Sequence, residues 1–407
     1  MNKIESPAAS ILLYSGWQTC NIGDIGHTPG TLAYLEKFLP KAKVTLWLLR
    51  GNEEVVGMLN ARFPRVKIVQ GEVNAEGRAS TPELQKALDE SEVVIYNSGM
   101  HFNKFWPSPI RVLNVFHTLK KHVVLYGHSF DGFREEELAA HLEAFSKCAL
   151  IYCRDNESLA YLRKENLSAR VLEFGPDGCF GSDVRDEARA ISYLKENGLE
   201  DRKFITVTIR TNTPKSGSRE AGDVLNPKVR SPELVAQDEL WAEKLRHLIA
   251  TWVKSTGKKV LLTPEVDKEI GPALELLWKR LPADIQKKVV HRNTFWNCDE
   301  AASIFARAHT VVCMEPHSCI LAMAAGTPVI HLASLKHGIK AWMFRDIGLP
   351  EWLYDIDQEK PEQFSNALLR IEADYPLALE KVRRSMRFVN DRSAEMMGEI
   401  GTLFLTD

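Results

Sequence analysis

The sequence has 407 residues, of which 44% are hydrophobic and 26% charged, and 52 Lys and Arg against 54 Asp and Glu give a formal net charge of −2. This length predicts two or three domains, and the composition excludes large-scale disorder, which requires low hydrophobicity and high net charge. The near-neutral charge excludes a global basic field that would attract nucleic acid or an anionic membrane. A local basic pocket for a small anionic substrate remains compatible with it.

Signals for membranes and secretion are weak. No apolar run approaches the ~20 residues of a membrane helix, and the short apolar run near the N-terminus favours a first strand over a signal peptide. The seven cysteines are odd in number and irregularly spaced, without C-x-x-C, so neither a disulfide framework nor a structural zinc site is expected. We therefore expect a protein of the reducing cytoplasm.

Short β-branched runs alternate with amphipathic stretches along the whole chain. Several runs are apolar throughout, as in strands that are buried on both faces of a parallel sheet. Thr81-Pro82 and Ser231-Pro232 each offer a cap followed by proline at the first position of a helix. The predicted strands are residues 11–15, 44–49, 66–69, 93–96, 123–127, 150–153, 170–174, 204–209, 259–262, 289–291, 310–314 and 329–332.

This alternation predicts an α/β fold with two Rossmann-like, doubly wound domains. We place an N-terminal domain at residues 1–195, a C-terminal domain at 196–375 and a helical tail at 376–407. The carboxyl ends of the two sheets are expected to face a cleft, where ligands of such folds bind. The polar segment 211–230 interrupts the pattern, and it is either a surface loop or a mobile substrate-binding loop.

A glycine-containing segment follows the first predicted strand, with Asn21, Gly23 and Asp24 at its centre. Glycine lets the backbone approach a ligand closely, and the next helix would point its N–H groups there. The segment matches neither G-x-G-x-x-G nor a Walker A loop, so a tight structural turn is an equally good interpretation. In a ligand loop, the aspartate would accept bonds from sugar hydroxyls or hold an arginine.

A stronger candidate site begins where the predicted strand 310–314 ends. Glu315, His317 and Ser318 lead into a helix of small residues that ends at Gly326. Polar side chains beside free backbone N–H groups at a helix N-terminus form a place for an anionic substrate. An imidazole there can exchange a proton near neutral pH, and the alternative is that His317 merely caps the helix.

Three cationic side chains, Arg154, Arg210 and Lys336, stand just after predicted strands. Together such cations could hold a phosphate and a carboxylate, whereas each one taken singly is more often a surface charge. Asp355-Ile-Asp357 is a lone match to the metal-binding pair of some glycosyltransferases, and we set it aside. Zinc-type spacing and a G-x-S-x-G elbow are both absent from the sequence.

Taken in order, these residues resemble the polysaccharide pyruvyl transferase family. The family's Asn-x-Gly-Asp loop is matched by residues 21–24, and its Gly-Gln-Ser-like turn by Gly127-His128-Ser129. Its Arg-Asp/Glu-x-x-Ser segment is matched by residues 154–158, and the aspartate that follows by Asp177.

The C-terminal part of the family pattern is a histidine-led helix, then Gly-x-Pro and a lysine. His317, residues 326–328 and Lys336 match it, so that the resemblance covers residues 10–345. Two departures stand out. Glu315 occupies a position where the family usually has an arginine, and residues 130–132 replace the usual Gly-Pro continuation of the middle turn. Because glutamate in place of arginine removes one anion contact, the identity of the donor stays open.

The resemblance implies a fold like the two-domain GT-B glycosyltransferase architecture and the transfer of a pyruvyl (carboxyethylidene) group from phosphoenolpyruvate to two hydroxyls of a sugar. His317 would be the acid or base, and Arg210 and Lys336 would hold the donor. Asn21, Asp24 and the segment 211–230 would meet the acceptor sugar. The full set of implied substrate-binding residues is Asn21, Gly23, Asp24, Ser129, Arg154, Asp177, Glu315 and Ser318.

By the same resemblance, no metal or organic cofactor is required, and the partners are a small phosphorylated donor and a sugar or glycan acceptor, not nucleic acid. Peripheral association with membrane-linked glycan precursors and homo-oligomerisation stay open. Two alternatives remain. One is a GT-B-type glycosyltransferase with a nucleotide-sugar donor, in which Glu315 would bond a ribose or sugar hydroxyl. The other is a non-catalytic sugar-binding relative.

Overall fold

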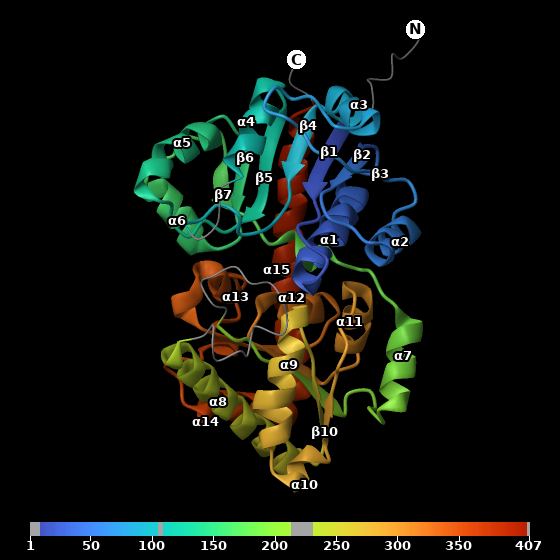
Figure 1. The fold of residues 1–407 in the computed structure, drawn as a ribbon, viewed down its shortest axis with the longest axis vertical. Coiled ribbons are helices and arrows are strands. Elements are labelled where there is room, and N and C mark those ends of the chain that lie inside the picture. The colour runs from blue at the N-terminus through green and yellow to red at the C-terminus, as the bar shows by residue number, and fades with distance from the viewer. Residues whose placement is uncertain (1–8, 105–108, 213–230, 405–407) are drawn as a thin grey trace. The chain divides into compact units, whose positions relative to one another are not determined.

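The structure is a computed structural model that describes residues 9–104, 109–212 and 231–404 (Figure 1). Most of the expected loop 211–230 therefore lies outside the described residues. Packing divides the chain into two compact units. Unit 1 consists of Met1–Thr19, His27–Ser182 and Phe388–Asp407, and unit 2 of Cys20–Gly26 and Asp183–Arg387.

This division differs from the expected boundaries at 195/196 and 375/376. Helix α7 (Glu187–Glu196) belongs to unit 2, where the backbone N–H of Asp186 donates to the carbonyl of Asp299 at 3.2 Å and Glu187 pairs with Arg307 at 2.5 Å. The sequence pattern identifies helices but does not say which sheet a helix at a boundary packs against.

The C-terminal tail is likewise divided between the units and does not stand apart. Its long helix α15 (Tyr375–Thr402) passes from unit 2 into unit 1 at Phe388. Within unit 1, Glu399 accepts a hydrogen bond from the Tyr152 hydroxyl at 2.6 Å, and Arg392 pairs with Glu173 at 2.6 Å. The C-terminal part of α15 thus contacts β6 and β7 of the unit 1 sheet.

Unit 1 contains a parallel seven-stranded sheet in the order β3-β2-β1-β4-β5-β6-β7 (Figure 1). Strands β4 and β6 are buried along their whole length, as the uninterrupted apolar runs predicted. The strands are β1 (Ser10–Ser15), β2 (Lys43–Leu48), β3 (Lys67–Val69), β4 (Val93–Tyr96), β5 (His122–His128), β6 (Leu150–Cys153) and β7 (Leu172–Phe174).

Helices connect these strands, as a parallel sheet requires. The predicted cap of α3 is confirmed, since the Thr81 side chain accepts from Leu84 N and Pro82 stands at the first helical position. The helices of unit 1 are α1 (Ile22–Phe38, with its first turn in unit 2), α2 (Glu53–Arg62), α3 (Pro82–Glu90), α4 (Ile110–Thr118), α5 (Glu135–Ser146), α6 (Asn156–Lys164) and the 3-10 helix η1 (Gly178–Gly181).

Unit 2 contains a parallel six-stranded sheet in the order β10-β9-β8-β11-β12-β13. The edge strand β13 was not predicted, because its three half-buried residues carry no periodic pattern. The strands are β8 (Phe204–Thr208), β9 (Lys259–Leu262), β10 (Val289–His291), β11 (Thr310–Cys313), β12 (Val329–Ala333) and β13 (Leu353–Asp355).

The helices of unit 2 include the long α8, whose predicted Ser231 cap is confirmed by a bond from Leu234 N. The α-helices are α7, α8 (Pro232–Thr256), α9 (Ile270–Pro272), α10 (Ala283–Gln286), α11 (Cys298–Phe305), α12 (Pro316–Ala324), α13 (Met343–Asp346), α14 (Pro361–Ala373) and the first part of α15. The short 3-10 and π segments are η3 (Asp267–Glu269), η4 (Ala273–Leu277), η5 (Trp278–Arg280), η6 (Leu335–His337), η7 (Ile339–Trp342) and η8 (Pro350–Trp352).

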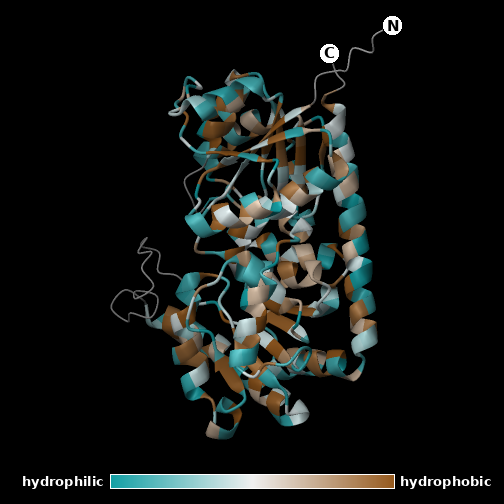
Figure 2. Cartoon of the chain, turned by 90° about the vertical axis from the view of Figure 1, so that its right-hand side faces the viewer, coloured by the Kyte–Doolittle hydropathy of each residue, from teal (hydrophilic) through white to brown (hydrophobic). Residues whose placement is uncertain are grey.

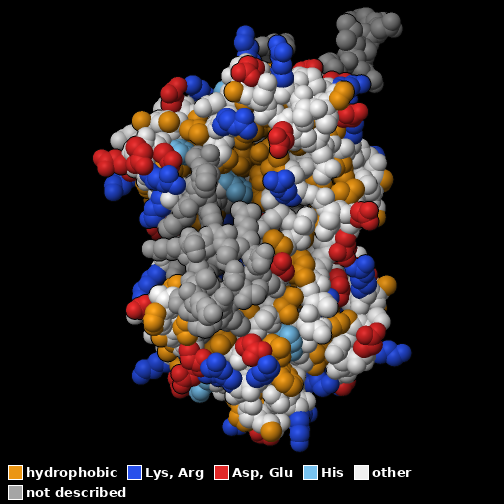
Figure 3. Space-filling view, viewed as in Figure 1, with side chains coloured by type: hydrophobic (Ala, Val, Ile, Leu, Met, Phe, Trp, Pro, Cys, Tyr) orange, Lys and Arg blue, Asp and Glu red, His pale blue; other side chains and the backbone are white. Residues whose placement is uncertain are grey.

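Hydrophobic residues concentrate on the strands of both sheets, which are mostly brown in Figure 2. On the face drawn in Figure 3, charged side chains of both signs are interspersed, in keeping with the small net charge. Within the described part of the chain, no helix combines the length and the apolar character that crossing a bilayer requires.

The Asp355-Ile-Asp357 motif has a structural role at the end of β13. One Asp357 oxygen accepts from the side-chain nitrogens of Gln237 and Trp241, both at 2.8 Å, and the other accepts from Ser334 Oγ at 2.7 Å. Three protein donors thus occupy the carboxylate and tie the edge strand to α8.

Gly30 in α1 allows the close packing of α1 against η1 to be tested. A Cβ at Gly30 would lie 2.1 Å from the carbonyl oxygen of Gly178, whereas a Cβ at Gly57, inside α2, would meet nothing within 4 Å. We expect Gly30→Ala to lower the free energy of unfolding by about 1–3 kcal/mol and the matched control Gly57→Ala to raise it by about 0.5–1 kcal/mol. Urea unfolding followed by circular dichroism measures both, and equal midpoints for the two variants would contradict the close approach.

Candidate active site

The strand order of unit 2 creates a topological switch point between β8 and β11. From these neighbours the chain proceeds to opposite sides of the sheet, to β9 and to β12, and ligands of open α/β sheets bind at the carboxyl ends of such strands. Arg210 follows β8, while Glu315 and His317 follow β11. Three residues that the sequence singled out therefore share one strand edge in unit 2.

The N-terminus of α12 is occupied by a side chain from the end of another strand of the same sheet. Glu265, which follows β9, accepts from the backbone N–H of Ser318 at 2.6 Å and of His317 at 3.4 Å, and also from Ser318 Oγ at 2.9 Å. The expectation that these N–H groups are free for a substrate anion is therefore wrong. An internal carboxylate takes the position, because it complements the partial positive charge of the helix end.

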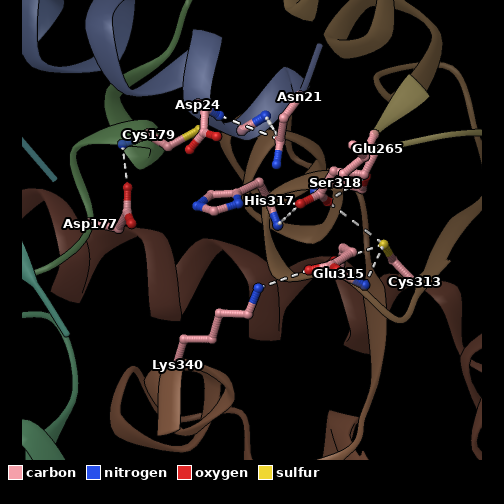
Figure 4. Close-up of polar contacts among 12 residues, drawn as sticks. Asn21, Asp24, Asp177, Cys179, Glu265, Cys313, Glu315, His317, Ser318 and Lys340 are labelled. Atoms are coloured by element: carbon pink, nitrogen blue, oxygen red, sulfur yellow. Dashed lines mark hydrogen bonds and ion pairs between the residues drawn. The ribbon is translucent and has the colours of Figure 1, made fainter. Parts of the chain in front are cut away.

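The same carboxylate contacts the imidazole. His317 Nδ1 lies 3.2 Å from Glu265 Oε1, and the two residues are 6% and 0% exposed (Figure 4). A carboxylate beside one ring nitrogen fixes the orientation of an imidazole and stabilises its protonated form. The pair is thus suited to moving a proton.

The Asn21–Asp24 segment belongs to unit 2 and not, as expected, to the N-terminal domain. Asn21 pairs with Val266 in an antiparallel bridge, and Ile22 N donates to the carbonyl of Glu265 at 3.0 Å. The Asn21 side chain accepts from the backbone N–H of Gly23 at 2.8 Å and of Asp24 at 3.4 Å, which caps α1. The motif therefore starts a helix and joins it to the loop that carries Glu265.

The position of Gly23 shows why the Asn21–Asp24 segment needs a glycine. A Cβ at this position would lie 2.2 Å from Cγ and 2.3 Å from Nδ1 of His317, so the first turn of α1 can lie against the imidazole only without a side chain. Figure 4 shows Asn21 and Asp24 on that turn beside His317. Two motifs at opposite ends of the family pattern are thus in contact.

Glu315 is held between two cations. Arg210 Nη1 lies 3.1 Å from one oxygen and Lys340 Nζ 2.8 Å from the other. Burial alone would raise the pKa of Glu315, but these two positive charges outweigh it and hold the pKa well below its usual range. The glutamate that replaces the usual arginine is therefore neutralised within the protein.

The sequence proposed Lys336 as a cation of this site. In the structure Lys336 is exposed, and the ammonium that reaches Glu315 is that of Lys340, in η7.

Glu269 is a second buried carboxyl beside this cluster. Its Oε2 accepts from the backbone N–H of Glu265 at 2.7 Å and of Val266 at 3.0 Å. Burial, followed by the negative charges of Glu315 and Glu265, raises the pKa of Glu269 well above its usual range. This shift favours the protonated form of the side chain.

Three other sequence-predicted residues lie together in unit 1. Arg154 pairs with Asp177 at 2.5 Å and donates from Nε to Ser129 Oγ at 2.8 Å, and Ser129 donates to Asp155 at 2.5 Å. Arg154 and Asp177 are each 1% exposed, so the group forms a buried polar network at the ends of β5, β6 and β7. These side chains satisfy one another in the structure.

Glu265, Glu269 and Lys340 were missed by the sequence analysis. Glu265 did carry a signal, since it stands just after the predicted strand 259–262, as Arg210 stands after 204–209. Lys340 carried none, because it lies in the second of two short helical turns whose direction only the packing decides.

Comparison with known proteins identifies the family. The sequence model for polysaccharide pyruvyl transferase matches residues 21–336, which is more than half of the chain. The chain belongs to the polysaccharide pyruvyl transferase family. Membership supports a transferase that modifies polysaccharide, and the resemblance drawn from the ordered motifs is confirmed. A search of curated proteins gives no match.

Solved structures agree on the fold. S. aureus MnaA, solved with UDP, is 11% identical over 98% of this chain and 97% of its own, with a TM-score of 0.58. Anabaena HepE in complex with UDP and glucose is 10% identical over 98% and 99%, with a TM-score of 0.54. The UDP-GlcNAc 2-epimerase of Neisseria meningitidis is 10% identical over 97% and 100%, also with a TM-score of 0.54. The predicted two-domain α/β fold of the GT-B type is confirmed.

The raised pKa of Glu269 predicts how stability depends on pH. Above the pKa of a glutamate in the unfolded chain, about 4.3, unfolding releases the Glu269 proton, so this group makes stability fall by up to about 1.4 kcal/mol per pH unit. Glu269→Gln keeps an acceptor oxygen and removes the titration, so the melting temperature of the variant relative to the native protein should rise steadily from pH 5 to pH 8. The control is Glu275→Gln, at a half-exposed glutamate in η4. A pH-independent difference for Glu269→Gln would show that the buried carboxyl is already ionised.

Proposed function

We propose that the protein transfers a pyruvyl group from phosphoenolpyruvate to hydroxyls of a sugar in a cell-surface glycan or its precursor. The observation that carries the proposal is the His317 imidazole, oriented by Glu265 and packed on Gly23 at the switch point of unit 2, in a chain of this family. The seven cysteines form no disulfide with one another, which favours the cytoplasm as the place of action.

The reaction needs proton transfer and anion binding. One sugar hydroxyl adds to C2 of phosphoenolpyruvate while C3 gains a proton, and the second hydroxyl then displaces phosphate from C2 to close the ketal. His317 is the proposed acid and base, exchanging protons at Nε2 because Nδ1 bonds Glu265. Each hydroxyl proton passes to a base, and phosphate leaves with the electron pair of its C–O bond.

Arg210 and Lys340 are the proposed donor clamp. Both already bind a carboxylate, that of Glu315, and their side chains are 30% and 22% exposed. A carboxylate or phosphate of the donor would bind by taking over contacts from Glu315. Lys336 remains a sequence-based candidate for the same role.

The acceptor sugar is assigned to the first turn of α1. Asn21 and Asp24 supply an amide and a carboxylate suited to sugar hydroxyls, and Gly23 lets that turn approach His317. Ser129, Arg154 and Asp177 are proposed to act by holding the strand ends of unit 1, because their polar atoms bond one another.

A nucleotide-sugar transferase is the second candidate. The ionised Glu315 favours it, since a carboxylate accepts bonds from ribose or sugar hydroxyls better than it tolerates a nearby phosphate. Structures of the same fold were solved with UDP or UDP-sugars, and this adds to the reasons for testing such donors.

Donor choice is tested by ligand-dependent melting and by phosphate release. We expect phosphoenolpyruvate to raise the melting temperature, because a ligand at about 100 times its Kd stabilises the native state by about 2.7 kcal/mol. We also expect release of inorganic phosphate only when a galactosyl or mannosaminyl acceptor is added. Stabilisation by uridine or guanosine nucleotide sugars, and none by phosphoenolpyruvate, would replace the first candidate by the second.

The role of His317 is tested by His317→Ala against His247→Ala, a partly exposed histidine of the same unit. Removal of a general acid or base lowers kcat by about 10²–10⁴-fold, so we expect that loss at position 317 and activity within about twofold of native at position 247. Circular dichroism and melting temperature verify that both variants fold. Full turnover by a folded His317→Ala protein would remove the histidine from the mechanism.

A further inference from the structure

Glu265 is the most densely bonded carboxylate of the candidate site. Its Oε1 lies 3.2 Å from His317 Nδ1 and 3.4 Å from His317 N, and its Oε2 lies 2.6 Å from Ser318 N and 2.9 Å from Ser318 Oγ. The side chain is 0% exposed. A buried negative charge requires such partners, and here helix α12 supplies nearly all of them.

The neighbouring carboxyl, Glu269, supports this charge. The raised pKa of Glu269, caused first by its burial and then by the charges of Glu315 and Glu265, favours its neutral form. Its Oε2 accepts from the backbone N–H of Glu265 and Val266, so it also fixes the loop on which Glu265 stands. Of these two buried carboxyls, Glu265 is the one whose oxygen faces the imidazole.

The position of Glu265 bears on the tautomer of His317. A carboxylate only accepts hydrogen bonds, so the ring nitrogen that faces it must carry a proton. In the neutral imidazole this leaves Nε2 as the proton acceptor. When Nε2 takes a proton, the resulting imidazolium faces a negative charge at hydrogen-bond distance. Gly23 lies close to Cγ and Nδ1 of the same ring, so the first turn of α1 also limits how the ring can rotate.

We propose that Glu265 is a positioning residue, which holds His317 in the Nδ1–H tautomer and stabilises its imidazolium so that protons are exchanged at Nε2. The proposal rests on the proposed acid–base role of His317, and it assigns Glu265 a second role besides capping α12. The other charged or titratable groups of unit 2 that belong to the same cluster are Asp24, Arg210, Lys268, Glu269, Cys313, Glu315 and Lys340.

The first test reads the tautomer directly and needs no substrate. Nitrogen-15 NMR of histidine-labelled full-length protein distinguishes Nδ1–H from Nε2–H, and the His317→Ala variant identifies the His317 signals among those of the 12 histidines. We expect the Nδ1–H tautomer in the native protein. Glu265→Gln places an amide that can donate toward Nδ1, so we expect Nε2–H there, whereas Glu265→Asp should keep Nδ1–H. An Nε2–H tautomer in the native protein overturns the proposal, even if Glu265→Gln does not fold.

The second test separates positioning from capping. We expect Glu265→Gln to lower kcat by about 10²–10⁴-fold, the range seen when a catalytic imidazole is held in the wrong tautomer or lost. KM should stay within about threefold, Glu265→Asp should recover part of kcat, and the acidic limb of the kcat/KM profile should move. The matched control is Asn297→Ala, which removes the side-chain cap of α11 in the same unit. A purely structural role predicts equal effects on kcat for the two cap variants at equal loss of melting temperature, and that result would overturn the proposal.

The two proposals fail in distinguishable ways. If phosphoenolpyruvate is not the donor, no pyruvyl transfer is seen, but the tautomer of His317 and its change in Glu265→Gln are still measured. If Glu265 only caps α12, pyruvyl transfer is seen and the tautomer does not respond to Glu265→Gln.

Discussion

The buried carboxylate of Glu265 at the N-terminus of α12 is the contact on which the candidate site depends. It joins the end of β9, the start of α12 and, through its own backbone carbonyl, the first turn of α1. These segments are far apart in the sequence, and each brings one part of the site: the carboxylate, the imidazole and the Asn21–Asp24 motif. Because this carboxylate is buried, it would have no hydrogen-bond donors if these segments moved apart, so their arrangement can vary little.

This internal anion changes how a substrate can bind. At the switch point of a Rossmann-like domain, a helix N-terminus commonly binds the phosphate of the ligand. In unit 2 that position is taken by Glu265, and the donor clamp that we propose is therefore made of the side chains of Arg210 and Lys340. Side-chain cations can exchange one bound carboxylate for another. The backbone N–H groups of α12 can do so less readily, because the carboxylate that they bind is buried.

Glu315 is therefore not a simple replacement of an arginine by an opposite charge. Its two cationic partners have side chains that are 30% and 22% exposed, whereas Glu315 itself is only 7% exposed. An incoming anion can therefore reach Arg210 and Lys340, but Glu315 must keep part of its contacts with them, because a buried carboxylate without partners is destabilising. Unit 1 contrasts with this, because the Arg154–Asp177 pair is almost fully buried and is bonded further to Ser129. If a substrate anion replaced one partner of this pair, a buried charge would be left unpaired. The network is therefore better suited to holding the strand ends rigidly than to binding an anion.

The sequence alone determined the family, the α/β class and the approximate position of all but one of the strands, β13, because apolar runs and capping residues act locally. It also singled out Arg210, Glu315 and His317 as residues that follow predicted strands, and parallel strands bring their carboxyl ends to one edge of a sheet. Only the tertiary structure decided that the Asn21–Asp24 segment packs with unit 2, that Glu265 fills the helix N-terminus, and that Lys340 binds Glu315. These contacts join segments that are far apart in the sequence. The burial of Glu265 and Glu315, which makes them require such partners, exists only once the chain has folded.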